Sequence, residues 1–266
     1  LNNNTGYLQG QYDIVHTTNQ GLNWTYQYTG KRTFLKNLNE GFGYSENFLY
    51  KTTNTGINWN SFTQGFRDEM FDVVFINQQT GFTAGDNTIY KTTNEGNTWI
   101  VYELNMSLGF TNVENIMFLN QNTGYAGIDG GRIAKTSNCG VNWQVIETGQ
   151  YDHLHGMHFP SIDTGYGVTK YGYYLKTINA GNNWSVTGRD TCTYGDIQFS
   201  NNTTGFSGGY DNNIDRGIIK RTTNGGLNWV VYYLDSMNSV SDVCNTSGNF
   251  WFAAGFGRYN NNNGQD

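Results

Sequence analysis

Short runs of apolar residues alternate with turns rich in glycine and asparagine along the whole chain. In some runs apolar and polar residues alternate, as in Asp196-Ile-Gln-Phe199, while others are continuously apolar, as in Val73-Val-Phe75 and Ile116-Met-Phe118. A period of two, bounded by glycine and asparagine, is typical of β-strands joined by tight turns. The pattern therefore predicts an all-β chain of many short strands.

An eight-residue motif, called the turn motif below, occurs six times and ends in tryptophan each time. Its first copy reads Thr17-Thr-Asn-Gln-Gly-Leu-Asn-Trp24. Consecutive tryptophans are 35 to 45 residues apart, which is the period expected of one supersecondary unit stacked on copies of itself. We expect each tryptophan to be an anchor buried between neighbouring units. The six are Trp24, Trp59, Trp99, Trp143, Trp184 and Trp229.

The third residue of the turn motif is always Asn and the fifth is always Gly. An Asn side chain can hydrogen-bond the backbone two residues on, and Gly supplies a positive φ that a residue with a Cβ resists. The motif therefore predicts a tight turn between two strands, and we regard its residues as structural. They are Asn19, Gly21, Asn54, Gly56, Asn94, Gly96, Asn138, Gly140, Asn179, Gly181, Asn224 and Gly226.

A second element lies upstream of each turn motif, where a Gly followed by Tyr or Phe opens a further strand, as in Thr80-Gly-Phe82 and Thr164-Gly-Tyr166. Together with the apolar run before it and the two strands around the turn motif, this gives four short strands per unit. Four antiparallel strands in roughly 40 residues, repeated six or seven times, indicate the blades of a β-propeller. We predict one β-propeller domain over residues 1–266.

The two ends of the sequence decide the predicted number of blades. The first unit starts just before Thr5-Gly-Tyr7, so its innermost strand is missing, and a seventh unit begins at Val240. In that last unit Asn262 and Gly264 take the motif positions, just before an expected tryptophan. We predict seven blades, the first and last incomplete; six blades with an overhang is the alternative. The expected units span about residues 1–33, 34–70, 71–112, 113–153, 154–193, 194–238 and 239–266.

Composition limits the classes of partner. Only 14% of the 266 residues are charged, 16% are aromatic, and the formal net charge is −6. Nucleic acids and anionic membranes need a dense cationic face, which 15 Lys and Arg spread over seven units do not provide. We therefore expect no nucleic-acid partner. No apolar run reaches the 18 residues of a membrane span, so no membrane insertion is expected, and no signal segment is seen.

The turn motif resembles the Asp-box, or bacterial neuraminidase repeat, with Asn where Asp is commoner. The full unit, Thr-Gly-Phe followed by Ile-Tyr-Lys-Thr-Thr-Asn-x-Gly-x-x-Trp, is similar to the propellers of the photosystem II assembly factor family and its relatives in non-photosynthetic bacteria. The resemblance covers nearly the whole chain. It implies a propeller whose repeated residues are structural and lie on the face away from any active site. With the Asn-rich composition, it also implies a secreted or cell-surface protein of Bacteroidetes-type bacteria.

An enzymatic reading has little support in the residues. Sialidases need an Arg-Ile-Pro motif, but the single proline, Pro160, follows Phe159 and precedes Ser161. Another glycosidase would need two carboxylates roughly 5–9.5 Å apart across a cleft, and spacing pairs none of the acids here. We therefore expect no catalytic residues, with a glycoside hydrolase as the alternative. The acids that could serve it are Asp68, Glu69, Asp86, Asp129, Asp152, Asp190, Asp211 and Asp235.

Metal and thiol chemistry have equally weak signals. His153, His155 and His158 fall within six residues, where they could hold a metal or make hydrogen bonds in a connection and an inner strand. The three cysteines are widely spaced and form neither a disulfide framework nor a metal-binding pattern. We predict no metal and no cofactor.

Aromatic and basic residues recur on the connections between blades and on the loops before the third strands. In a propeller these two sets of loops converge on one face, called the loop face below. A ring of aromatics and guanidinium groups there would suit stacking on sugars or holding a peptide carboxylate. The alternative is that these are scattered surface residues. The candidate ligand-binding residues are Arg32, Arg67, Tyr151, Arg189, Tyr194 and Arg216.

These observations favour a non-catalytic binding or adhesion module, secreted or at the cell surface. Its ligand would be a protein segment or a glycan at the cell envelope. A purely architectural repeat of a larger surface assembly is a further alternative.

Overall fold

The computed structural model describes residues 6–9, 13–20, 22–28, 32–35, 39–45, 48–54, 57–61, 66, 70–104, 112–247 and 250–257. Within these ranges every regular element is a β-strand, as the sequence pattern predicts. The described part of the chain contains no helix of the length and apolar character needed to cross a membrane.

The strands form antiparallel sheets in which neighbours along the chain are hydrogen-bonded neighbours in the sheet. The first sheet holds β1 (Gly6–Gln9), β2 (Asp13–Thr17) and β3 (Thr25–Tyr28). The second holds β4 (Arg32–Leu35), β5 (Gly41–Ser45), β6 (Phe48–Thr52) and β7 (Asn60–Ser61). The third holds β8 (Met70–Phe75), β9 (Gly81–Gly85), β10 (Thr88–Thr92) and β11 (Ile100–Glu103). The fourth holds β12 (Val113–Phe118), β13 (Gly124–Ile128), β14 (Arg132–Thr136) and β15 (Gln144–Glu147).

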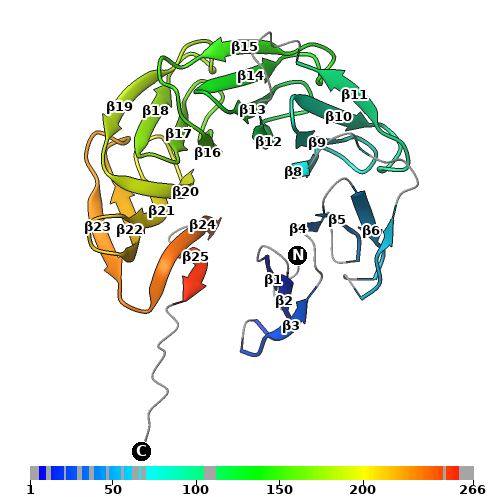
Figure 1. The fold of residues 1–266 in the computed structure, drawn as a ribbon, viewed down its shortest axis with the longest axis horizontal. Coiled ribbons are helices and arrows are strands. Elements are labelled where there is room, and N and C mark those ends of the chain that lie inside the picture. Colours follow the sequence, from blue (N-terminus) through cyan, green and yellow to red (C-terminus); the bar gives the residue numbers. More distant parts are fainter. Residues whose placement is uncertain are drawn as a thin grey trace, which may run out of the picture. The chain divides into compact units, whose positions relative to one another are not determined.

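The remaining sheets follow the same order. The fifth holds β16 (Leu154–His158), β17 (Gly165–Thr169), β18 (Tyr173–Thr177) and β19 (Ser185–Arg189). The sixth holds β20 (Cys192–Phe199), β21 (Gly205–Asp211), β22 (Arg216–Thr222) and β23 (Val230–Leu234). The seventh holds β24 (Met237–Ser247) and β25 (Phe250–Gly257). Figure 1 shows this strand order in each sheet. The described residues thus contain seven sheets, as the repeat predicts.

By compactness the chain divides into two units, residues 1–129 with 134–145 and residues 130–133 with 146–266. The second unit carries the candidate site.

An aromatic stack joins neighbouring sheets inside each unit. The Tyr or Phe that opens the second strand of one sheet stacks on the Phe that ends the inner strand of the next. The ring centroids are 4.3 Å apart for Phe82 and Phe118 and 3.6 Å apart for Tyr166 and Phe199. The inner-strand ring covers the Gly paired with it across the strands, so that a Cβ on Gly205 would lie 2.6 Å from the Phe199 ring. The Gly of this element is therefore required by close packing.

The seventh sheet makes the same kind of aromatic contact, but its aromatic residue lies on the second strand and not on the inner strand. At the cross-strand position where the sixth sheet has Phe199 and Gly205, the seventh has Asn245 and Trp251. The aromatic ring has moved to the second strand, and Trp251 packs against Phe206 with centroids 4.2 Å apart. The junction is conserved in shape although the sequence pattern has changed.

The turn-motif tryptophans are mostly buried, as predicted. Trp99 and Trp184 are 3% and 8% exposed, and Trp143 and Trp229 are partly buried and pack against apolar clusters. Trp24 differs, since 44% of its surface is exposed. The prediction that every motif tryptophan is a buried anchor is therefore wrong for Trp24.

The turn motif is a tight turn, but its hydrogen bonds differ from those predicted. The Asn Oδ1 accepts the backbone N–H of the fourth residue on, not the second; the distance from Asn94 Oδ1 to Thr98 N is 2.9 Å. The first Thr of the motif donates its hydroxyl to the same oxygen, at 3.0 Å for Thr92. The motif Gly has a positive φ, as expected, and so does the residue before it, with φ of 82° at Gly96 and 62° at Glu95. The other five motifs make the same two Asn contacts.

Inner-strand side chains also bond the backbone of the next sheet. Asp72 Oδ2 accepts the N–H of Ile116 at 2.9 Å, and Asp196 Oδ2 accepts the N–H of Val243 at 3.4 Å. Burial raises the pKa of Asp196 well above its usual value, and the neighbouring Asp242 carboxylate raises that pKa further. The folded protein therefore favours the protonated form of Asp196.

This carboxyl predicts a pH dependence of stability. When folding raises the pKa of a carboxyl group, the contribution of that group to stability is fully present below its pKa in the unfolded chain, about 3.9. The contribution is lost as the pH rises through the pKa of the group in the folded protein. Each pKa unit corresponds to about 1.4 kcal/mol. We expect Asp196→Asn, which cannot ionise, to raise the melting temperature at pH 8 more than at pH 4. The fourth sheet already has Asn115 at this register position.

Thermal unfolding of both proteins followed by circular dichroism at the two pH values would measure the difference. Parallel pH profiles for the parent and the variant would contradict the assignment of this pH dependence to Asp196.

Candidate ligand-binding site

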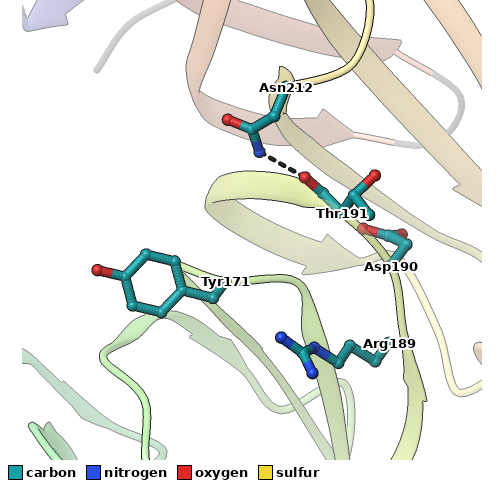
Figure 2. Close-up of a pocket in the computed structure, with 5 residues that line it drawn as sticks. All are labelled: Tyr171, Arg189, Asp190, Thr191 and Asn212. Atoms are coloured by element: carbon teal, nitrogen blue, oxygen red, sulfur yellow. Dashed lines mark hydrogen bonds between the residues drawn. The ribbon is translucent and has the colours of Figure 1, made fainter.

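A hollow of about 580 Å³ lies in the second unit, where the loop between β17 and β18 meets the connection from β19 to β20. Both segments belong to the sets of loops that the sequence places on the loop face. Figure 2 shows the side chains that line it. They are Tyr171, Arg189, Asp190, Thr191 and Asn212.

One backbone hydrogen bond joins the two segments, and a second hydrogen bond ties the loop between β17 and β18 to Asp152. Asp190 N–H donates to the carbonyl oxygen of Gly172 at 3.1 Å, and Tyr171 N–H donates to Asp152 Oδ2 at 2.8 Å. Gly172 has a φ of 92°, which favours glycine, and its missing Cβ leaves room for the Asp190 carbonyl. The short loop 170–172 therefore places the Tyr171 ring beside the hollow, with 53% of its surface exposed.

Arg189 contributes the unpaired positive charge of the hollow. Its guanidinium stacks over the Tyr173 ring at 4.6 Å, a cation–π contact that orients the group and leaves its edge N–H donors open. In the part of the chain that the structure describes, no carboxylate pairs with Arg189. A planar fork of donors held in this way suits a carboxylate ligand.

Asp190, next to Arg189, is fully engaged by the protein. Its Oδ2 accepts the Tyr194 hydroxyl and the Lys220 ammonium, each at 2.6 Å, and its Oδ1 accepts the N–H of Cys192 at 2.9 Å. Burial alone would raise the pKa of Asp190, but hydrogen bonds from Lys220, Tyr194 and the backbone outweigh it and hold that pKa below its usual value. Asp190 is therefore ionised, its charge is compensated by Lys220, and its oxygens are occupied by hydrogen bonds within the protein.

Asn212 closes the remaining side. Its Nδ2 donates to the Thr191 carbonyl oxygen and to Thr193 Oγ1, and the first of these bonds is drawn in Figure 2. The neighbouring Asn213 donates to Thr191 Oγ1 at 2.6 Å. The amides thus fix the β19–β20 connection to the loop between β21 and β22.

The structure separates the six predicted ligand-binding residues. Arg189 lines the hollow, and Tyr151 stands 93% exposed on the connection before β16. Arg216 instead pairs with Asp235, with 2.8 Å between Nη1 and Oδ1. Arg32 begins β4, but its side chain lies outside the described residues, as does Arg67 entirely.

Tyr194 was expected on a connection, and its side chain is instead 0% exposed. Strand β20 begins at Cys192, so Tyr194 already follows strand alternation and points into the core. Burial raises the pKa of its phenol, which keeps the hydroxyl protonated as a donor to Asp190. Tyr194 therefore does not line the hollow, but its hydroxyl holds the lining residue Asp190 in place.

Two of the clustered histidines bond the next sheet. His155 Nδ1 lies 2.9 Å from the Tyr194 carbonyl oxygen, and His158 Nδ1 accepts the N–H of Phe199 at 3.3 Å. His153 lies edge-on to Tyr171, with ring centroids 6.3 Å apart. The contacts of His155 and His158 are of the kind expected if these histidines make hydrogen bonds in a connection and an inner strand.

Sequence reasoning missed Lys220, Thr191 and Asn212. Thr and Asn are too frequent in this chain to single out. Lys220 had a detectable signal, because it is charged at a strand position where the first five units carry Val, Tyr, Ala or Leu.

No protein-family model matches the chain, and no curated protein matches it. Among solved structures, the chain is similar to YCF48 bound to a D1 peptide, with 16% identity over 86% of this chain and 77% of that one and a TM-score of 0.64. It is similar to YCF48 from Cyanidioschyzon merolae, with 13% identity over 94% of this chain and 88% of that one and a TM-score of 0.71. It is also similar to an ancestral GH74 enzyme, with 17% identity, 76% of this chain and 31% of that one covered, and a TM-score of 0.63.

Identities this low carry information on the fold alone. The four-stranded antiparallel sheets and the likeness to these structures agree, and the predicted fold class is confirmed. The chain is a β-propeller, and its sheets are the blades.

Proposed function

We propose that this protein is a non-catalytic binding module that holds a protein segment on its loop face, with the hollow at Arg189 as the main contact. The observation that carries the proposal is the Arg189 guanidinium, stacked on Tyr173 and without a carboxylate partner among the described residues. An acidic side chain or a terminal carboxylate of the segment would complete its hydrogen bonds.

The neighbouring groups suit an extended peptide. Tyr171 offers an exposed ring for stacking, while Thr191 and Asn212 offer polar atoms at the opposite wall. Concave sites with an aromatic wall and a few oriented polar groups are typical of specific ligand recognition. One solved propeller of similar fold is described as bound to a peptide, which supports a protein segment as the ligand.

Three of the acids expected on this face favour binding over hydrolysis. Asp190 pairs with Lys220, and Asp235 pairs with Arg216. Asp152 accepts the N–H groups of His153 and Tyr171. A glycosidase needs an acid and a base that are free to exchange protons with substrate, and these carboxylates are already engaged by the fold.

Location at the cell envelope, secretion and membership in a larger surface assembly are part of the same proposal. They rest on the amide-rich, weakly charged composition and on the repeat. A glycan is the alternative ligand, since Tyr171 and the surrounding amides could also stack on and bond a sugar.

The test is an array of peptides that differ in one position, Glu, Gln or Lys, beside a glycan array, probed with the full chain. We expect the Glu peptides to bind best and Arg189→Ala to weaken their binding about tenfold or more, as expected for loss of a charge-assisted hydrogen bond. Arg216→Ala is the matched control, because Arg216 is already paired with Asp235 and does not line the hollow. Equal loss in both variants, or binding to glycans alone, would refute the proposal.

A further inference from the structure

Lys220 occupies a strand position that the first five units fill with uncharged side chains. Strand register places it two residues before the first Thr of the turn motif, opposite Ser207. It is nevertheless buried, with 7% of its surface exposed, and its counterparts in the third and fifth sheets, Tyr90 and Leu175, are also buried. The residues at this position in the first five sheets are Val15, Tyr50, Tyr90, Ala134 and Leu175.

The Lys220 side chain extends from β22 to the connection beneath the hollow. Its ammonium lies over the Tyr194 ring, 5.5 Å from the centroid, and bonds Asp190 Oδ2 at 2.6 Å. Asp190 is the one carboxylate among the residues that line the hollow. The buried charge is therefore directed at the lining of the candidate site.

Folding alone does not account for this pair. Buried ion pairs are often no more stabilising than apolar residues of similar volume, because both charges lose their hydration. The first five sheets fold with Val, Tyr, Ala or Leu at this position. A buried charge at a position where the first five sheets have none indicates a role in the neighbouring site.

We propose that Lys220 sets the sign of the charge in the hollow, and so determines its selectivity for anionic groups. With Lys220 in place, the Asp190 carboxylate is neutralised and the charge of Arg189 faces the ligand. Without Lys220, Asp190 would cancel the charge of its neighbour Arg189 and repel a carboxylate. Lys220 is thus a specificity-determining residue that does not line the site. The inference rests on the proposed function for its biological meaning, but its electrostatics can be tested without a peptide.

The probe is acetate, titrated into the ¹⁵N-labelled protein while the Arg189 Nε–Hε signal is followed by NMR. The variant Lys220→Gln removes the charge and keeps a donor for Asp190. We expect it to weaken acetate binding at Arg189 about tenfold or more, as expected for loss of one neighbouring unit charge in a partly exposed site. The double variant Lys220→Met with Asp190→Asn removes both charges and should restore acetate binding to near the parent level.

Two controls separate this role from a structural one. Lys176→Gln changes a lysine of the same unit that donates to the Gly225 carbonyl oxygen at 3.0 Å, outside the hollow, and should leave acetate binding unchanged. Melting temperatures of all variants check folding. A merely structural Lys220 would lower the melting temperature without changing the affinity for acetate in the folded protein.

The proposal is overturned if the parent does not bind acetate at Arg189, if Lys220→Gln binds it as well as the parent, or if the double variant stays as weak as Lys220→Gln. A failure of the proposed function would give a different set of results. In that case acetate binding would still depend on Lys220 as described, but the peptide array would show no preference for Glu and no dependence on Arg189.

Discussion

Replacing Trp99 with alanine is expected to lower the free energy of unfolding by about 3–5 kcal/mol, the usual cost of truncating a fully buried large aromatic. Trp99 is 3% exposed. Its ring meets Phe42 and Phe75 edge to face, at centroid distances of 6.5 and 6.1 Å. Its Nε1 donates to the Gly96 carbonyl oxygen at 3.0 Å. The substitution would leave a large cavity and remove the partner of that carbonyl.

The same motif supplies a matched control. Trp24 holds the equivalent position in the first turn motif but is 44% exposed, so Trp24→Ala should cost less than about 1 kcal/mol. Urea unfolding followed by circular dichroism would compare the variants. Equal costs for the two substitutions would show that the tryptophans act through the turn itself and not through packing between sheets.

Replacing Gly131 with alanine is expected to cost about 2–5 kcal/mol, from a strained φ together with a steric overlap. Gly131 has a φ of 74°, and a Cβ there would overlap the Gln150 carbonyl oxygen. The backbone cannot easily move away. Gly131 N–H donates to the Asp152 carbonyl oxygen at 2.7 Å, and the Thr148 N–H donates to the Gly131 carbonyl oxygen at 2.9 Å.

Gly149 is the control for backbone strain alone. It has a φ of 84°, but a Cβ at this position would have no atom within 4 Å. Gly149→Ala should therefore cost only about 1 kcal/mol. Melting temperatures and urea midpoints measure both variants. If Gly149→Ala were as costly as Gly131→Ala, steric overlap with Gln150 would not be the main cause.

Local chemistry allowed much of the scaffold to be predicted. The turn motif could be identified because a Thr, an Asn and a Gly at fixed spacing are enough to close the turn by themselves. Its exact hydrogen bonds were missed, since Asn94 reaches Thr98, four residues on. The number of sheets followed from the repeated motif together with the partial units at the two ends of the sequence, because each sheet is a continuous stretch of chain.

The candidate site was only partly predictable. Arg189 was recognised as a residue of the loop face because it lies at the end of a strand, where a loop begins. Tyr194 was misplaced because the exact start of β20 decides whether a side chain belongs to a loop or to the core, and sequence patterns place strand ends only within a few residues.

By itself, then, the sequence determined the strands, the turns and the repeating sheets, since these depend on residues close together in the chain. The tertiary structure decided the rest. Asp190 and Lys220 are 30 residues apart and meet only because neighbouring sheets pack in one register. In the seventh sheet Trp251, on the second strand, makes the contact with the preceding sheet that Phe199, on the inner strand, makes in the sixth. The packing between sheets is thus kept, although the residue that makes it stands at a different place in the sequence. The charge of the hollow depends on such contacts between sheets, and a one-dimensional pattern does not contain them.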